Sequence, residues 1–425
     1  MASIMMTAMP FAGHARPVRS VAAELVRRGH DVRVHTGRSY AGTFTDVGAR
    51  AVPWAAPPDL DERDLAATFP RMRDRKGFRQ VLVNLEDLFL GTAPAQCDDL
   101  VAEHAREPWD LLAGDPMALG TRFAAEHLGT PWATVSPIAY WPPGRGIPPT
   151  GLGLTPAHGV PGRVRDAVLG AAAGAGTALL TRAYQRTRRD AGLAPDRETF
   201  ATMWFSPQLV VAAGVPGLDY PRGDLPAHVW FVGDLTDDGR APGPSALPAW
   251  WEDVLRATVP VVHVTQGTAN VDPHDLILPT LDALADEDVL VVVGLGHRTD
   301  PLPGPLPANA RVAPMVPYPH LLPRTSLMVT NGGYGGVLQA LRHDVPLVVA
   351  GGDLDKPEIA ARVGWHGAGV DLRTGTPRAG AVRDACRRVL GDPRYAATAA
   401  RLGDELRAAG GARAAADRLE DHLAR

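Results

Sequence analysis

The chain lacks the features that mark secreted, metal-binding and membrane proteins. Only two of its 425 residues are cysteines, Cys97 and Cys386, which excludes a disulfide framework and a cysteine-rich zinc site. The first residues carry no basic segment of the kind that opens a signal peptide, and they enter a strand-like pattern at once. We therefore expect a protein of the reducing cytoplasm.

Long apolar runs and an excess of one charge are also missing. The longest apolar run, residues 167–181, consists mainly of Ala, Gly and Leu between charged flanks. It is too short and too weakly apolar for a membrane span, so we expect no stable membrane insertion. We predict instead a helix that is buried or lines a groove. The net charge of −4 gives no support for a nucleic-acid partner.

The chain does have the composition and length of an ordinary globular protein. Hydrophobic residues make up 45% of it and charged residues 21%, which is typical of a soluble protein. Because single hydrophobic cores stop growing near about 250–300 residues, the length of 425 residues predicts two domains.

Strand-like and helix-like segments alternate in the first third of the chain. The expected strands are residues 3–9, 31–35, 51–54, 111–113 and 132–135. A helix is expected over residues 18–26, where Gly29 stops it, and another over residues 118–128. Repeated strand–helix units predict an α/β fold with a doubly wound parallel sheet.

The same alternation restarts after an irregular middle. Further strands are expected at residues 209–213, 229–232, 260–264, 289–293, 311–315, 327–329 and 347–349, with a helix at 274–285. The segment TDDGRAPGPSALP is the best linker candidate. We predict a Rossmann-like N-terminal domain at 1–235, a linker at 236–248, a second Rossmann-like domain at 249–395, and C-terminal helices at 396–425 that pack back toward the first domain. The site is expected in the cleft between the domains.

Residues 327–361 hold the most informative pattern. A strand-like run is followed by a glycine-rich loop and then by helical spacing from Val337. The glycines are Gly332, Gly333, Gly335 and Gly336. Glycine lets backbone N–H groups approach a ligand closely, and a helix N-terminus offers free N–H donors with about half a positive charge, which suits a phosphate. The other interpretation is a tight turn that closes a strand onto a helix.

An acidic and basic pair, Asp355 and Lys356, follows the next expected strand in what reads as a polar loop. In an open α/β sheet, the loops at the carboxyl ends of strands share one crevice. A phosphate cradle and a hydroxyl-binding carboxylate in one crevice together predict a sugar nucleotide as the ligand.

His14 and Asp115 each follow an expected strand, so both are predicted at the carboxyl edge of the N-terminal sheet. A His and an Asp on neighbouring strand ends can form a general base with its orienting carboxylate. Such a base typically contributes about 10²–10⁴ in rate. The alternative is that His14 caps the first helix and that Asp115 is a turn residue before Pro116.

No G-x-G-x-x-G motif follows the first strand, where residues 9–14 read MPFAGH. This absence argues against a nicotinamide or flavin dehydrogenase, because a bound pyrophosphate would lack the glycines that allow its close approach.

Several segments, taken in order, resemble the GT-B-fold glycosyltransferases that use nucleotide-diphosphate sugars, in particular the bacterial enzymes that modify natural products and small molecules. The matching segments are GHARPVRSVAAELVRRGHDVRVHT (13–36), DLLAGDPMALGTRFAAEHLGTP (110–131), VTQGT (264–268), VAPMVPYPHLLPRTSLMVTNGGYGG (312–336) and GGDLDKPEIAARV (351–363). The resemblance covers nearly the whole chain and implies two Rossmann-like domains that face each other across a cleft.

The resemblance implies a role for each matching residue. His14 is the expected general base for the acceptor, and Asp115 is its partner. The implied donor-binding residues are Thr265, Gly267 and Thr268 along the diphosphate, Met315 and Val316 at the nucleobase, Asn331, Gly332, Gly333, Gly335 and Gly336 at the diphosphate, and Asp355 with Lys356 at the sugar. Separately, Tyr140 and Trp141 in the loop after residues 132–135 are candidates for an apolar acceptor pocket.

Three positions depart from the family pattern. Asn331 stands where His is usual, Gly336 where Ser or Thr is common, and Lys356 where Gln is usual. Asn can still donate to a phosphate oxygen, but a neutral hydrogen bond contributes about 0.5–1.5 kcal/mol against about 1.5–3 kcal/mol for a charged one. Lys356 can bind a sugar oxygen, a carboxylate or the diphosphate, or it can pair with Asp355 or Glu358.

The resemblance implies an inverting glycosyltransferase that moves a sugar from a UDP or dTDP donor to a small apolar or aromatic acceptor. No cofactor is expected besides the nucleotide sugar, and no acidic cluster in the sequence is typical of a divalent-metal site. A monomer or homodimer is expected. A sugar-nucleotide epimerase of the same shape and a catalytically silent auxiliary protein remain as alternatives.

Overall fold

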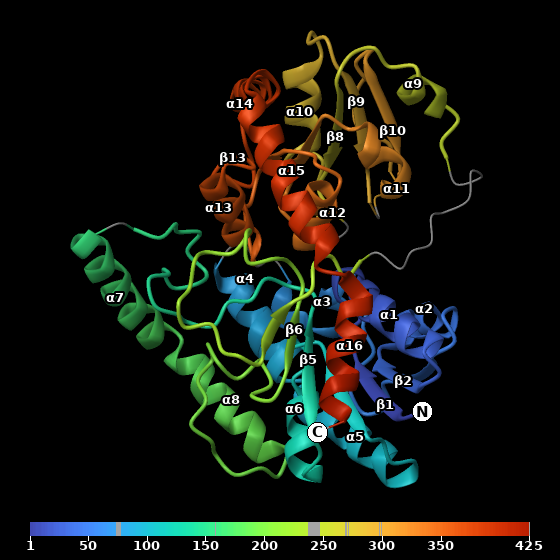
Figure 1. Cartoon of the computed structure of the whole chain (residues 1–425), viewed down its shortest axis with the longest axis vertical. Coiled ribbons are helices and arrows are strands. Elements are labelled where there is room, and N and C mark those ends of the chain that lie inside the picture. The colour runs from blue at the N-terminus through green and yellow to red at the C-terminus, as the bar shows by residue number, and fades with distance from the viewer. Residues whose placement is uncertain are drawn as a thin grey trace.

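Two parallel sheets, stacked end to end along the long axis of the molecule, organise the chain (Figure 1). The computed structural model describes residues 1–73, 78–157, 159–236, 247–267, 270, 272–296, 298 and 300–424. Most of the predicted linker and Thr268 lie outside these residues. The predicted fold class of two parallel-sheet α/β domains is confirmed.

The N-terminal sheet has seven strands in the order β3-β2-β1-β4-β5-β6-β7. Its strands are β1 Ser3–Thr7, β2 Asp31–Thr36, β3 Arg50–Pro53, β4 Leu111–Gly114, β5 Trp132–Ser136, β6 Val210–Ala212 and β7 Val229–Phe231. The C-terminal sheet has six strands in the order β10-β9-β8-β11-β12-β13. These are β8 Val261–Thr265, β9 Leu290–Gly294, β10 Ala310–Ala313, β11 Leu327–Thr330, β12 Leu347–Val349 and β13 Gly369–Asp371.

Helices cover both faces of each sheet, so the central strands are buried along nearly their whole length and consist mainly of apolar residues. In the N-terminal domain they are α1 Ala12–Arg27, α2 Ala41–Thr45, α3 Leu65–Thr68, α4 Phe78–Val83, α5 Ala93–Arg106, α6 Gly120–Leu128, α7 Gly159–Gly176 and α8 Ala178–Asp190. The later helices are α9 Trp251–Leu255, α10 Ile277–Leu284, α11 Tyr318–Leu321, α12 Tyr334–Arg342, α13 Lys356–His366, α14 Ala379–Gly391, α15 Pro393–Ala408 and α16 Gly411–Leu423.

Every strand that the sequence predicts is present, with ends that move by no more than about two residues, as is usual for such boundaries. The edge strand β13 was not predicted, and the segment after β12, expected as a polar loop, becomes helix α13 at Lys356. Pro357 lies in the first turn, where the fixed φ of proline favours the start of a helix.

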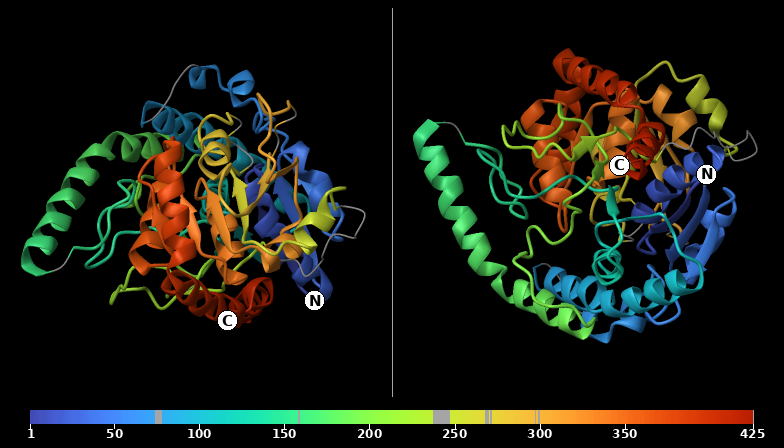
Figure 2. Two further views of the ribbon diagram at one scale, coloured as in Figure 1. Left: turned by 90° about the horizontal axis from the view of Figure 1, so that it is seen from above. Right: turned by 60° about the horizontal axis from the view of Figure 1, so that its bottom comes forward.

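The sequence predicts that residues 167–181 form a helix that is buried or lines a groove, and the prediction of burial is wrong for α7. Val160, Val164 and Val168 of this helix are 63%, 57% and 62% exposed. Both views in Figure 2 place α7 at the outer rim of the molecule, away from the two sheets. Residues 170–176 are all Ala or Gly, so this part of the helix has little side-chain area to bury against a sheet.

The last two helices link the two domains. Helix α15 packs on α12 of the C-terminal domain, and α16 packs on α1 of the N-terminal domain. One cluster of buried apolar residues therefore contains Val18 of α1, Leu419 of α16 and Leu338 of α12. The chain turns between the two helices at Gly410, whose φ of +90° is costly for residues other than glycine.

This packing predicts that Leu419→Ala destabilises the protein. Leu419 is fully buried against α1, so the truncation leaves a cavity and costs about 2–5 kcal/mol in the free energy of unfolding. Asp421→Ala on the exposed side of the same helix is the control, with an expected change within about 0.5 kcal/mol. Differential scanning calorimetry measures both. Equal melting temperatures for the two variants would contradict the packing of α16.

Candidate active site

The carboxyl ends of two neighbouring strands bring the candidate base and its partner together. Strands β1 and β4 pair in parallel, with Thr7 opposite Gly114. Asp115 follows β4 directly, and its N–H donates to the carbonyl oxygen of Thr7 at 3.1 Å. His14 lies in the first turn of α1, and its Nδ1 is 2.8 Å from Oδ2 of Asp115. The structure thus places the two residues in contact, as the sequence predicts.

The carboxylate of Asp115 is held by three donors. Besides His14, the N–H of Met9 donates to Oδ2 at 3.1 Å and the N–H of Met117 donates to Oδ1 at 3.0 Å. The side chain is fully buried. Three donors on one buried carboxylate fix its direction. Asp115 is therefore a rigid support for the imidazole.

This contact assigns the tautomer of His14. A carboxylate only accepts hydrogen bonds, so Nδ1 carries the hydrogen and Nε2 is the basic nitrogen. The His14 side chain is 17% exposed, and Nε2 has no hydrogen-bond partner within the described part of the chain. An oriented imidazole with one free, accessible nitrogen is the arrangement that a general base requires.

The surroundings of His14 also set its basicity. Burial lowers the pKa of His14, because a charged imidazolium loses hydration. The negative charge of Asp115 and its hydrogen bond oppose burial, and the charges of Asp355 and Glu62 add to this effect. Together they raise the pKa of His14 above its ordinary value of 6.5.

Asp355 brings the second domain into the same site. It is the N-cap residue of α13, yet its charge contributes to the raised pKa of His14. In return, burial raises the pKa of Asp355, while the charges of Lys356 and His14 oppose that rise. The charges of the candidate base and the candidate sugar-binding carboxylate therefore influence each other's titration across the domain boundary.

The glycine-rich loop after β11 opens onto α12 at Tyr334, three residues earlier than the spacing predicts. Gly335 and Gly336 thus belong to the first helical turn rather than to the loop. The N–H of Val337 donates to the carbonyl oxygen of Gly333 at 3.1 Å, so the N–H groups before it in the helix have no intrahelical acceptor. Gly335 and Gly336 are among these N–H groups, as expected for donors at a helix N-terminus. The other two predicted glycines donate within the loop, Gly332 to Oγ1 of Thr330 at 3.2 Å and Gly333 to Oδ1 of Asn331 at 3.4 Å.

Gly332 shapes the loop itself. Its φ is +89°, and a Cβ at this position would lie 2.8 Å from Cγ1 of Val349. Both the backbone conformation and the space therefore require glycine. By contrast, a Cβ at Gly336 would meet nothing closer than 3.7 Å, at Cε of Met328. The serine or threonine usual at this position in the family would fit.

Asn331 joins two loops. Its Nδ2 donates to the carbonyl oxygen of Gln266, and its Oδ1 accepts from the N–H of Gly333 at 3.4 Å. The side chain is 7% exposed. Because both ends of the amide bind backbone groups, Asn331 links the loop after β8 to the glycine-rich loop. The amide nitrogen carries a second hydrogen, so donation to a phosphate oxygen stays a prediction.

Lys356 pairs with neither Asp355 nor Glu358, the two partners considered from the sequence. Its Nζ binds Oδ1 of Asp353, three residues earlier. Glu358 is engaged elsewhere, with backbone N–H groups of the N-terminal domain. The ammonium group is thus held at the start of α13, beside Asp355.

The remaining donor-side candidates lie at the ends of β8 and β10. Thr265 is buried, and its Oγ1 accepts from the N–H of Gly267 at 3.2 Å, where φ is +73°. Val316 is buried, whereas Met315 is 49% exposed. These residues therefore present mainly backbone and one flexible apolar side chain to the domain boundary.

The two aromatic acceptor candidates differ in exposure. Tyr140 is 5% exposed and packs edge-on against Phe205 at 5.0 Å between ring centroids. Trp141 is only half-buried and contacts the same ring at 4.9 Å. Tyr140 is thus a core residue, and Trp141 keeps the accessible surface that an acceptor pocket needs.

Two residues near His14 were missed as site candidates from the sequence. The ring of Phe11 lies 6.0 Å from the imidazole and 6.4 Å from Phe89. Glu62 accepts from the N–H of Ala12 at 2.9 Å, at the start of α1. The place of Phe11 three residues before His14 was a usable signal, whereas nothing in the sequence links Glu62 to the first helix.

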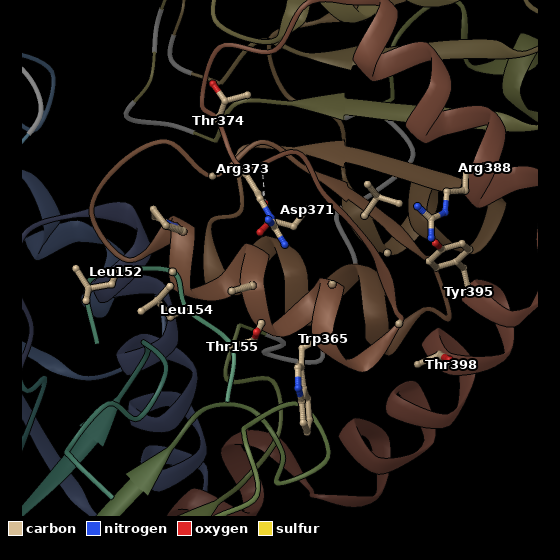
Figure 3. Close-up of a pocket in the computed structure, with 18 of the residues that line it drawn as sticks. Leu152, Leu154, Thr155, Trp365, Asp371, Arg373, Thr374, Arg388, Tyr395 and Thr398 are labelled. Atoms are coloured by element: carbon tan, nitrogen blue, oxygen red, sulfur yellow. Dashed lines mark hydrogen bonds between the residues drawn. The ribbon is translucent and has the colours of Figure 1, made fainter. Parts of the chain in front are cut away.

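A cavity of about 1170 Å³ lies beside α13 and does not include the His14 group (Figure 3). Trp365, Arg388 and Tyr395 contribute to its wall. Around Asp355 and Lys356, the residues that line the cavity are Gly351, Gly352 and Pro357. A candidate active site is defined by titratable groups in mutual contact rather than by volume, so the His14 group remains the centre of the chemistry.

The part of the chain that the structure describes holds no group of three or more His, Cys, Asp or Glu side chains arranged to bind a metal ion. Among the same described residues, no helix combines the length and the apolar character that crossing a membrane requires.

Comparison with known proteins gives a consistent result. Residues 279–421 match the family model described as the erythromycin biosynthesis protein CIII-like C-terminal domain. The chain is 39% identical to 4'-demethylrebeccamycin synthase of Lentzea aerocolonigenes, over 96% of each chain. It is 31% identical to UDP-glycosyltransferase 2 of Phaeomoniella chlamydospora, over 98% of this chain and 95% of the relative.

Among solved structures, the glycosyltransferase VinC in complex with dTDP superimposes with a TM-score of 0.69. The two chains are 22% identical, and the match covers 100% of both. At this identity the likeness establishes the fold alone.

The geometry around His14 predicts its titration. Because the pKa is raised, the His14 resonances should titrate with a midpoint above 6.5 in NMR spectra recorded against pH. Asp115→Asn removes the nearest negative charge, so burial prevails and the midpoint falls below that of the unaltered protein. The exposed His127 serves as internal control and should not move. An unchanged His14 midpoint in the Asp115→Asn protein would contradict the contact between His14 and Asp115.

Proposed function

Because the chain belongs to the GT-B-fold glycosyltransferases, which use sugar-nucleotide donors on natural products and other small molecules, we propose that it catalyses an inverting, metal-independent sugar transfer. The proposed donor is a UDP- or dTDP-sugar. The observation that carries this proposal is the oriented base pair His14–Asp115, within electrostatic reach of Asp355 on the other domain.

In the proposed reaction, His14 activates the acceptor. Nε2 takes the proton from the acceptor nucleophile as that atom forms its bond to the anomeric carbon of the donor. Asp115 stabilises the imidazolium that results and keeps the ring oriented. The bond between the anomeric carbon and the diphosphate oxygen breaks, and the electron pair leaves with the nucleoside diphosphate. Attack on one face and departure from the other invert the anomeric configuration.

The C-terminal domain is proposed to hold the donor. The free N–H groups at the start of α12 face the negative charge that develops on the leaving diphosphate. The carboxylate of Asp355 accepts hydrogen bonds from sugar hydroxyls, and Lys356 donates to a sugar oxygen beside it. The second N–H of the Asn331 amide adds a side-chain donor to these backbone groups.

The names of related proteins support both nucleotides. One relative is named for UDP, and one structure of the same fold contains dTDP. On the acceptor side, the half-exposed Trp141 and the pair Phe11–Phe89 near His14 favour an apolar or aromatic compound. Proteins that use sugar nucleotides in this way need no cofactor beyond the donor itself.

The test is turnover with UDP- and dTDP-sugars against a panel of phenolic and polyketide acceptors, followed by mass spectrometry. We expect transfer by the unaltered protein and a loss of about 10²–10⁴ in kcat for His14→Ala. His127→Ala, on the exposed surface of α6, is the matched control and should keep full activity. Full turnover by His14→Ala would remove the proposed base. Nucleotide binding without transfer would favour a silent auxiliary protein, and interconversion of the free donor sugar would favour an epimerase.

The stereochemistry and the metal requirement are tested on the same reaction. We expect that EDTA leaves the rate unchanged, because no step of the proposed mechanism uses a metal ion. We also expect a product whose anomeric configuration, read from proton NMR couplings, is opposite to that of the donor. Retention of configuration, or a rate that EDTA abolishes and Mg²⁺ restores, would overturn this part of the proposal.

A further inference from the structure

A buried carboxylate of the C-terminal domain is held by a loop of the N-terminal domain. Oε1 of Glu358 accepts from three successive backbone N–H groups, those of Gly151, Leu152 and Gly153, at 2.9, 3.0 and 2.7 Å. Glu358 is 4% exposed. Hydrogen bonds to a charged group are roughly twice as strong as neutral ones, so this contact ties α13 firmly to the segment between β5 and α7.

The loop has a backbone shape that suits an anion. Gly151 and Gly153 have φ values of +100° and +59°, which turn successive N–H groups toward one point. A Cβ at Gly153 would lie 3.0 Å from Cβ of Pro357 in α13. The two glycines therefore allow both the turn of the loop and its close approach to the helix.

The same helix makes a second contact one turn later. Arg362 donates from Nε to Oδ1 of Asp219 at 3.1 Å, and its Nη1 is 3.2 Å from Oε2 of Glu358. Its guanidinium lies over the ring of Tyr220, 4.5 Å from the centroid. The Tyr220 hydroxyl in turn donates to the carbonyl oxygen of Leu154 at 3.1 Å. One face of α13 is thus bound to two segments of the N-terminal domain.

These contacts connect both halves of the candidate site. On one side, Glu358 lies in the first turn of α13, directly after Asp355 and Lys356. On the other, Thr150 at the start of the loop donates from Oγ1 to the carbonyl oxygen of Trp141 at 3.1 Å. Leu152 of the loop and Trp365 of α13 line one cavity (Figure 3).

We propose that Glu358 and Arg362 form an interdomain clasp, meaning their contacts with the loop of residues 151–153 and with Asp219. This clasp positions the start of α13, with Asp355 and Lys356 at the donor sugar, against the N-terminal domain that binds the acceptor. This inference rests on the proposed transfer reaction. Neither residue is proposed to touch substrate. Both are positioning residues, which fix the distance between the anomeric carbon and the acceptor that His14 activates. A misplacement of about 1 Å can cost on the order of 10²-fold in rate.

The test compares Glu358→Gln with the unaltered protein. Gln has nearly the same shape but no charge, so it weakens the bonds to the loop and to Arg362. We expect kcat for transfer to fall about 10- to 100-fold, while the Kd for UDP or dTDP changes less than about twofold. We also expect a larger share of the consumed donor to be hydrolysed by water instead of transferred, because water needs no alignment.

Glu420→Gln is the matched control. Glu420 of α16 also joins the domains, through Arg28 at 2.6 Å and His30 at 2.8 Å, but it lies far along the chain from the donor turn. We expect it to leave both kcat and the share of hydrolysis unchanged. Gly153→Ala disturbs the loop that binds Glu358, and it should reproduce the effect of Glu358→Gln. The double variant should fall no further than either single one, since both break one interaction.

Each outcome of this comparison supports or overturns the proposed clasp. A Glu358→Gln protein with unaltered kcat and unaltered hydrolysis share overturns the clasp, even if its melting temperature falls. Loss of nucleotide binding in Glu358→Gln and Gly153→Ala alike also overturns it, because the residues then act on the fold of the donor domain. Absence of transfer by the unaltered protein refutes the proposed function itself.

Discussion

The parallel pairing of β1 with β4 is the constraint on which the site depends. The strands approach so closely that a Cβ at Gly114 would lie 2.2 Å from the hydroxyl of Thr7, which itself is hydrogen-bonded to Thr121 at 2.6 Å. This approach places Asp115 directly behind His14 and surrounds its carboxylate with donors. The tautomer, orientation and raised pKa of His14 all follow from that one placement.

A site divided between two domains also needs the domains to be held in register, and two kinds of contact do this. Helix α16 lies on α1 with a buried apolar surface, which is strong but not directional. Close to the donor turn, Glu358 and Arg362 make short, charged and directional bonds. The apolar contact keeps the domains together, and the charged contact determines how one loop meets one helix.

Much of the fold was predictable because buried parallel strands are continuous apolar runs. The sequence therefore located the strands, and strand order along the sheet brought His14 to Asp115. The prediction from the sequence failed where the composition of a segment is typical of a different structure. Polar residues at the start of α13 resemble a loop, and an apolar run in α7 resembles a buried helix. The backbone partner of Asn331 was not predictable, because it depends on how loops from two different strands meet in space. Lys356 pairs with Asp353, three residues earlier in the same segment, a partner that was not considered from the sequence.

In the proposed reaction, peptide N–H groups rather than side chains at the start of α12 bind the diphosphate. Every residue except proline carries such a group, so most single substitutions at this turn leave the donors in place. Only changes that redirect the main chain, such as a side chain at Gly332, remove them. This part of the protein is robust to mutation, whereas contacts to the sugar and the acceptor depend on individual side chains. Substrate preference can therefore evolve without loss of the anion-binding turn.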